Sequence, residues 1–107
     1  MTTKGPGKKL TIYLDETDKH GGKPVYEVLL DVLYRHKISG ASVFRGVAGY
    51  GSDGIFHTSK MLELSTSLPV KIEVVDSEET INRVLPEIEQ VVGKGLIEIS
   101  DTMILKS

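Results

Sequence analysis

Hydrophobic and polar residues alternate along several segments of the chain, which is the pattern of half-buried β-strands. The alternation is clearest in residues 8–14 and 69–75, and a further strand is predicted over residues 41–47. A last strand, or a pair of strands, is predicted over residues 96–99 and 103–105. The strands over residues 8–14 and 69–75 each place aliphatic residues on one face: Leu10, Ile12, Leu14, Val70, Ile72 and Val74.

Two other segments repeat apolar residues at the spacing of an amphipathic helix. The first helix is expected to begin at Pro24, where the missing N–H is no loss, and to stop near Lys37. The second is expected to begin after Ser77, a good N-cap that acidic residues follow, and to end at a glycine-rich turn. Pro86 lies inside this second pattern and predicts a kink or a restart of the helix.

The predicted order is strand, helix, strand, strand, helix, strand. This order is typical of a ferredoxin-like α+β sandwich, in which two helices cover one face of an antiparallel sheet. We expect one domain over residues 8–107, preceded by a disordered arm over residues 1–7. The connection over residues 48–68 is longer than the roughly 12–15 residues usual in compact domains, which indicates function or local structure. Residues 58–64 within it fit a short strand or a helical turn equally well.

Composition narrows the class of protein. The chain has 107 residues, a formal net charge of −2 and no cysteine. Disulfides and thiolate chemistry are therefore excluded, and a cytoplasmic location is the simpler expectation. The small negative net charge does not attract a polyanion such as a nucleic acid. No predicted strand carries the aromatic motif of RNA-recognition domains either, so nucleic-acid binding is not expected. No apolar run approaches the roughly 20 residues of a membrane helix.

The richest candidate for function is the glycine-rich loop over residues 45–57, which holds four of the 11 glycines. Glycine lets a ligand approach the main chain closely, and nearby cations favour an anion. The bland alternative is a flexible hairpin turn. On the first interpretation the loop supplies these ligand-binding residues: Arg45, Gly46, Gly49, Gly51, Gly54, His57 and Lys60.

Catalytic chemistry finds little support in the residue pattern. No nucleophile elbow and no placed pair of carboxylates is present, and no two histidines have the spacing of a helical zinc pair. We therefore predict no enzyme activity, no catalytic residue, no metal site and no cofactor. A metal-dependent hydrolase that uses Asp15, Asp18 and His57 is kept as an alternative. Carboxylates at the end of a strand, however, usually belong to a solvated turn.

Four segments resemble an uncharacterised prokaryotic PII-like family, domain of unknown function 190, which is related to the nitrogen-regulatory PII proteins. They are residues 18–27, 40–46, 57–58 and 68–76, so the resemblance extends over nearly the whole chain. The order of the elements and the glycine loop also look like PII proper. The chain departs from PII in the loop, at Ser52 and Asp53, and in lacking the arginine pair of the last strand.

The resemblance implies a homotrimer in which adenine nucleotides sit in clefts between subunits, and a mobile loop that contacts a partner. By position, Gly49, Gly51 and Gly54 match the glycines at the base of that loop. The turn that matches the phosphate side of the PII cleft adds three binding residues: Gly93, Lys94 and Gly95. From the residues alone, this turn is also an ordinary helix C-cap, in which a lysine complements the helix dipole.

These observations predict a PII-like, ligand-responsive regulatory protein that is not an enzyme. An adenine nucleotide or another anionic small molecule would order the loop, and Tyr50 and Phe56 would then meet an unidentified protein partner, for which a membrane transporter is one candidate. The main alternative is a structural interaction module that binds no ligand.

Overall fold

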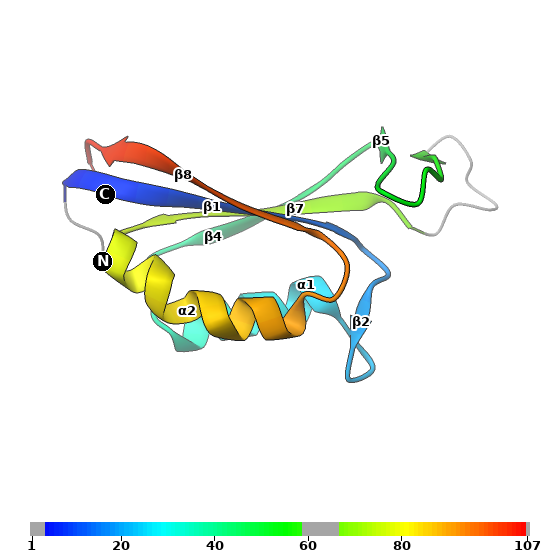
Figure 1. Cartoon of the computed structure of the whole chain (residues 1–107), viewed down its shortest axis with the longest axis horizontal. Coiled ribbons are helices and arrows are strands. Elements are labelled where there is room, and N and C mark those ends of the chain that lie inside the picture. Colours follow the sequence, from blue (N-terminus) through cyan, green and yellow to red (C-terminus); the bar gives the residue numbers. More distant parts are fainter. Residues whose placement is uncertain (1–3, 59–66, 107) are drawn as a thin grey trace.

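In a computed structural model, which describes residues 4–58 and 67–106, two helices cover one face of a four-stranded antiparallel sheet (Figure 1). The main elements in chain order are β1 (Gly5–Asp15), α1 (Val25–Arg35), β4 (Ala41–Arg45), β7 (Pro69–Asp76), α2 (Glu78–Val91) and β8 (Leu96–Ile104). The strands lie side by side in the order β4-β7-β1-β8. This topology confirms the predicted ferredoxin-like α+β fold, with β8 as one strand rather than a pair.

Two very short strand pairs complete the described structure. β2 (Lys19–His20) and β3 (Lys23–Pro24) form a hairpin just before α1. β5 (Ala48–Gly49) and β6 (His57–Thr58) pair within the long connection between β4 and β7. The predicted strand or helical turn over residues 58–64 lies outside the described residues, apart from the single position that ends β6.

The sheet begins earlier in the chain than the sequence pattern predicts. Residues 5–7, assigned to a disordered arm by that pattern, belong to β1 and pair with β8, Gly5 opposite Ile104 and Gly7 opposite Thr102. The prediction is therefore wrong for these residues. The reason is that β8 is nine residues long and provides backbone partners beyond the alternating part of β1.

The C-terminus of α1 is closed by a Schellman motif, the 6→1 and 5→2 hydrogen-bond pair that ends many helices. The N–H of Ile38 donates to the carbonyl of Leu33 (3.1 Å), and the N–H of Lys37 donates to that of Tyr34 (3.0 Å). Lys37 takes the left-handed conformation, with φ of 60°. The predicted end of the helix is therefore close to the observed one.

α2 begins as predicted and continues where a break was possible. The Ser77 Oγ accepts a hydrogen bond from the N–H of Thr80 (3.2 Å), which confirms Ser77 as the N-cap. The helix runs without interruption through Pro86 to Val91, so the predicted restart does not occur.

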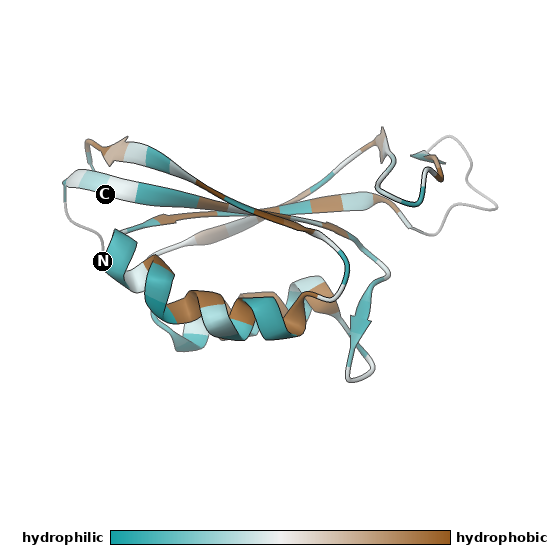
Figure 2. Cartoon of the chain, in the orientation of Figure 1, coloured by the Kyte–Doolittle hydropathy of each residue, from teal (hydrophilic) through white to brown (hydrophobic). Residues whose placement is uncertain are grey.

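The core lies between the two helices and the inner face of the sheet. Figure 2 shows hydrophobic residues along the sheet and on the helices, whereas the β2 hairpin is hydrophilic. The largest fully buried side chains are Leu10, Ile12, Leu29, Leu33, Ile72, Ile81 and Ile88. On the outer face, where no described helix packs, Tyr13, Phe44, Val75 and Leu96 are at least one-third exposed. Among the described residues, no helix is long and apolar enough to cross a membrane.

Candidate functional site

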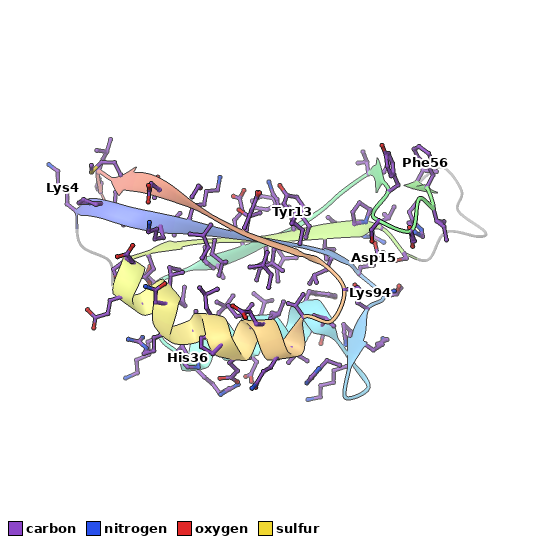
Figure 3. The ribbon with its side chains drawn as sticks, viewed as in Figure 1. Lys4, Tyr13, Asp15, His36, Phe56 and Lys94 are labelled. Carbon is purple, nitrogen blue, oxygen red and sulfur yellow. The ribbon has the colours of Figure 1, made fainter. Side chains whose placement is uncertain are left out.

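A cavity of about 950 Å³ lies where β1 ends, the β4–β7 connection begins and the turn after α2 leads into β8. In Figure 3, Asp15, Lys94 and Phe56 gather at this end of the molecule, and Lys4 lies at the other end. The cavity brings the glycine loop and the turn after α2 to the walls of one space. These two segments are about 45 residues apart in the sequence and were predicted to form one site.

Most of the predicted binding residues line this cavity: Arg45, Gly46, Gly49, Gly51, Lys94 and Gly95. Of the others, Gly54 and His57 belong to the hairpin but are not among the described lining residues. Gly93 lines a neighbouring pocket of about 450 Å³, together with Asp18 and Lys94. Lys60 lies outside the described residues.

The glycines of the site serve the packing of the chain more than the approach of a ligand. A Cβ on Gly46 would lie 2.8 Å from Pro69 Cγ, and the N–H of Gly46 donates to the Pro69 carbonyl (2.7 Å). Gly95 has a φ of 149°, and a Cβ there would lie 2.7 Å from the carbonyl oxygen of Tyr13. At Gly51, in contrast, an added Cβ would meet no described atom within 4 Å. The predicted role, close approach of a ligand to the main chain, therefore fits Gly51 best.

The guanidinium of Arg45 is already held by a carboxylate. Its Nε and Nη2 donate to the two oxygens of Glu16 at 2.9 and 2.8 Å, in a bidentate pair. Glu16 also accepts from the N–H of Leu68 (3.1 Å), and these interactions, with that to Arg45 the largest, lower the pKa of the Glu16 carboxyl below its ordinary value. Arg45 is therefore a paired cation, and its partner lies 29 residues away in the sequence, where no local pattern indicates it.

The walls of the cavity carry both signs of charge. The Lys71 ammonium contacts Glu73 (3.0 Å) and lies 5.1 Å from the centroid of the Phe44 ring. Lys94 makes no ion pair with any residue that the structure describes. The charged lining residues comprise three cations and four carboxylates: Arg45, Lys71, Lys94, Asp15, Asp18, Asp53 and Glu98. With Arg45 and Lys71 paired, Lys94 is the cation best placed to meet an anion.

Strand register explains the lining residues that the sequence analysis missed. Tyr13 stands opposite Leu96 on one side and Lys71 on the other, and Phe44 stands opposite Lys71. The four residues therefore form one row across the outer face of the sheet. Alternation places each residue on that face, but only the pairing of the strands puts them in one row.

A group of metal-binding types lies beside the cavity. Asp15, Asp53 and His57 each offer an oxygen or nitrogen atom, and these atoms all lie within 4.8 Å of one another. The alternative set from the sequence used Asp18 in place of Asp53. In the structure, the Asp18 carboxylate instead accepts a hydrogen bond from the N–H of Asp15 (3.1 Å).

The β5–β6 hairpin carries exposed apolar side chains on both sides of its turn. The rings of Tyr50 and Phe56 contact each other, with centroids 4.7 Å apart, yet both side chains are more than half exposed. Val47 and Ile55 are also exposed in the same segment. Tyr50 and Phe56 are the two residues for which contact with a partner was predicted.

Comparison with known proteins places this chain in a family. The family model described as DUF190, Uncharacterized ACR, COG1993, matches residues 7–104, nearly the whole chain. This chain belongs to the DUF190 family. It is similar to a UPF0166 protein of Methanocaldococcus jannaschii, with 46% identity over 100 residues and 92% of each chain covered. A UPF0166 protein of Aquifex aeolicus is 40% identical, again over 92% of each chain.

The fold of this DUF190 chain is also similar to that of solved PII-like proteins. One of them is CPII of Thiomonas intermedia, a nitrogen regulatory PII-like protein solved bound to ADP, AMP and bicarbonate. The TM-score is 0.72 at 21% sequence identity, and the match covers 94% of this chain and 90% of CPII. The comparison establishes a PII-like fold for the DUF190 chain, as the resemblance implied.

Proposed function

We propose that this DUF190 protein is a PII-like regulatory protein that binds a small anion in the cavity between the loop base and the turn after α2. An adenine nucleotide is the first candidate. The observation that carries the proposal is that the two predicted binding segments line the same cavity of about 950 Å³. That volume lies within the range of sites that hold molecules of nucleotide size. The ligands of CPII, a protein of the same fold, favour the same choice.

The base and the phosphate of a nucleotide each have a suitable surface in the cavity. The rings of Tyr13 and Tyr50 offer apolar faces on which a base can stack. Lys94 supplies the ammonium group for a phosphate, and the backbone at Gly51 is open to close approach. No catalytic role is part of the proposal.

The response to the ligand would pass through the pair of Arg45 and Glu16. The Glu16 carboxylate contacts the start of the connection through Arg45 and its end through the Leu68 N–H. An anion in the cavity competes with Glu16 for Arg45, because a guanidinium binds a phosphate as well as a carboxylate. Such competition shifts the population of loop conformations and so changes how the hairpin presents Tyr50 and Phe56 to a partner.

Assembly and location complete the proposal. The exposed outer face of the sheet carries aromatic and aliphatic side chains and fits contact between copies of the chain, for which the family resemblance implies a homotrimer. The regulated partner would be a protein that the exposed hairpin contacts, and a membrane transporter is one candidate. The regulator itself would act in the cytoplasm.

Titration with ADP, AMP and ATP, in the presence of a metal chelator, tests the proposal. A ligand of the folded state must raise the melting temperature, and isothermal titration calorimetry then gives its affinity. We expect Lys94→Ala to weaken binding by about tenfold or more, as loss of a charged hydrogen bond does. Lys23→Ala, which removes an exposed lysine outside the cavity lining, is the matched control and should bind like the native protein.

The alternatives give different results in the same experiment. A structural interaction module predicts no shift in melting temperature with any of the three nucleotides. A hydrolase predicts release of phosphate when a divalent metal replaces the chelator, and loss of that release in Asp15→Asn. Equal binding by the native protein and Lys94→Ala would show that the ligand occupies another site.

A further inference from the structure

Three side chains from separate segments meet beside the cavity at the end of β1. Asp15 is the last residue of β1, Asp53 lies in the turn of the β5–β6 hairpin, and His57 is the first residue of β6. Their candidate ligand atoms all lie within 4.8 Å of one another. Ligands that share one ion at metal bonds of about 2.1 Å stand roughly 3.4 Å apart, so small side-chain rotations would close the set around an ion.

The charges around this cluster favour a cation. Two carboxylates stand close together, and Asp18 and Glu98 add two more to the lining of the adjoining cavity. Two cations of that lining are already paired, Arg45 with Glu16 and Lys71 with Glu73, so among the described lining residues Lys94 alone stands against the four carboxylates. Repulsion between like charges at this distance costs free energy that a bound divalent ion would offset.

We propose that Asp15, Asp53 and His57 bind a zinc ion. The donor set of two carboxylate oxygens and one imidazole nitrogen suits zinc, whereas magnesium and calcium prefer oxygen ligands alone. One Asp53 oxygen accepts the N–H of Ile55 (2.9 Å), a bond of the kind that holds a ligating carboxylate in a fixed orientation. Three protein ligands leave the fourth tetrahedral position to water.

The ion would fasten the hairpin to the body of the domain. Asp15 belongs to the central sheet, and Asp53 and His57 belong to the hairpin that carries Tyr50 and Phe56. In the described structure the hairpin itself is closed by only a two-residue pairing, Ala48 with Thr58 and Gly49 with His57. Metal binding is coupled to the order of the segment that supplies the ligands, so zinc would stabilise this arrangement of the hairpin.

Calorimetric titration of untagged, chelator-stripped protein with zinc chloride tests the site. We expect one ion per chain, and at least about tenfold weaker binding in His57→Gln, which removes the imidazole ligand, and in Asp53→Asn, which replaces a charged carboxylate ligand by a neutral amide. Glu89→Gln is the control: it removes an exposed carboxylate on α2 that belongs neither to the cluster nor to the described cavity lining. Its zinc affinity should equal that of the native protein.

Hydrogen exchange gives a second readout that does not depend on affinity. With zinc, the amides of residues 48–58 should exchange more slowly in the native protein and in Glu89→Gln but not in His57→Gln, while the core amides of all three stay alike. The absence of zinc binding by the native protein, or equal binding by His57→Gln, would overturn the proposal. The nucleotide titrations use a chelator and no zinc, so the two proposals succeed or fail separately.

Discussion

At the scale of single residues, Glu16 contacts both ends of the long connection between β4 and β7. Its carboxylate contacts Arg45 at the start of the long connection and the N–H of Leu68 at its end. The backbone N–H of Glu16 also donates to the Leu68 carbonyl (2.9 Å). One residue after β1 therefore holds both ends of the segment that carries the hairpin.

This arrangement predicts how stability depends on pH. Arg45 lowers the pKa of Glu16 below its ordinary value of 4.5, so the ionised carboxylate is favoured by folding. Its contribution is present above about pH 4.5 and is lost as the pH falls through the lower pKa of the folded state. We expect Glu16→Gln to reduce the free energy of unfolding by about 1 kcal/mol at neutral pH. Urea unfolding at several pH values measures this.

The difference between the native protein and Glu16→Gln should shrink as the pH falls below 4.5, because the native glutamate then becomes neutral as well. Glu89→Gln is a suitable control, since Glu89 is an exposed residue of α2 away from the site. Its stability curve should run parallel to the native one. A Glu16→Gln deficit that stays constant down to acid pH would contradict the role given to the charge.

Some functions of single residues follow from the sequence, and others depend on the fold. The N-cap role of Ser77 was predictable because its partner is three residues away. The pairing of Glu16 with Arg45, and the meeting of Asp15 with Asp53, involve residues 29 and 38 positions apart. Such contacts have no local signal, because they depend on where the connection returns to the sheet.

At the scale of elements, the end of α1 holds a residue that is ill suited to its conformation. Lys37 occupies the left-handed position of the Schellman motif, where a Cβ is unfavourable and glycine is the usual residue. We predict that Lys37→Gly raises the free energy of unfolding by about 0.5–1 kcal/mol. Urea unfolding monitored by circular dichroism measures the gain.

Lys37→Ala separates the conformational effect from loss of the lysine charge. Alanine keeps the Cβ, so this variant should gain no stability from relief of the left-handed conformation. An equal gain in both variants would mean that the charge, rather than the backbone, is responsible.

The larger elements were predictable because their patterns are long. β1 and β7 alternate over enough residues for their buried faces to be identified, and the stripe of α2 extends through Pro86. The β2–β3 and β5–β6 pairs contain two residues in each strand, too few for any periodicity. The glycine loop was therefore identified by its composition, but its hairpin was not.

The β5–β6 hairpin matters for the site because its strand pairing sets which loop residues lie beside the end of β1 and which line the cavity. Pairing of Gly49 with His57 turns Asp53 back toward the end of β1 and leaves Gly51 beside the cavity. His57, which was predicted from its place in the loop as part of the anion site, lies close to Asp15 and Asp53. The candidate site is thus two adjoining features, a cavity and a cluster of ligand-type side chains.

At the scale of the whole molecule, the two faces of the sheet differ in a way that bears on assembly. The inner face is covered by α1 and α2, whereas no described helix covers the outer face (Figure 1). Tyr13, Val75 and Leu96 lie exposed on that outer face, beside the ion pairs that Glu73 forms with Lys9 and Lys71. Apolar side chains on an uncovered sheet face are stabilised when another copy of the chain covers them.

The uncovered face supports assembly, and the family resemblance implies three copies, so we predict that the protein has three times the 11.7 kDa mass of its chain in solution, as measured by light scattering after size exclusion. Val75→Asp, which places a charge on the outer face without touching the described cavity lining, should shift the mass toward that of one chain. Tyr34→Asp replaces an apolar residue that is 84% exposed on α1 and should leave the mass unchanged. A native mass of one chain, or equal effects of the two substitutions, would exclude assembly through this face.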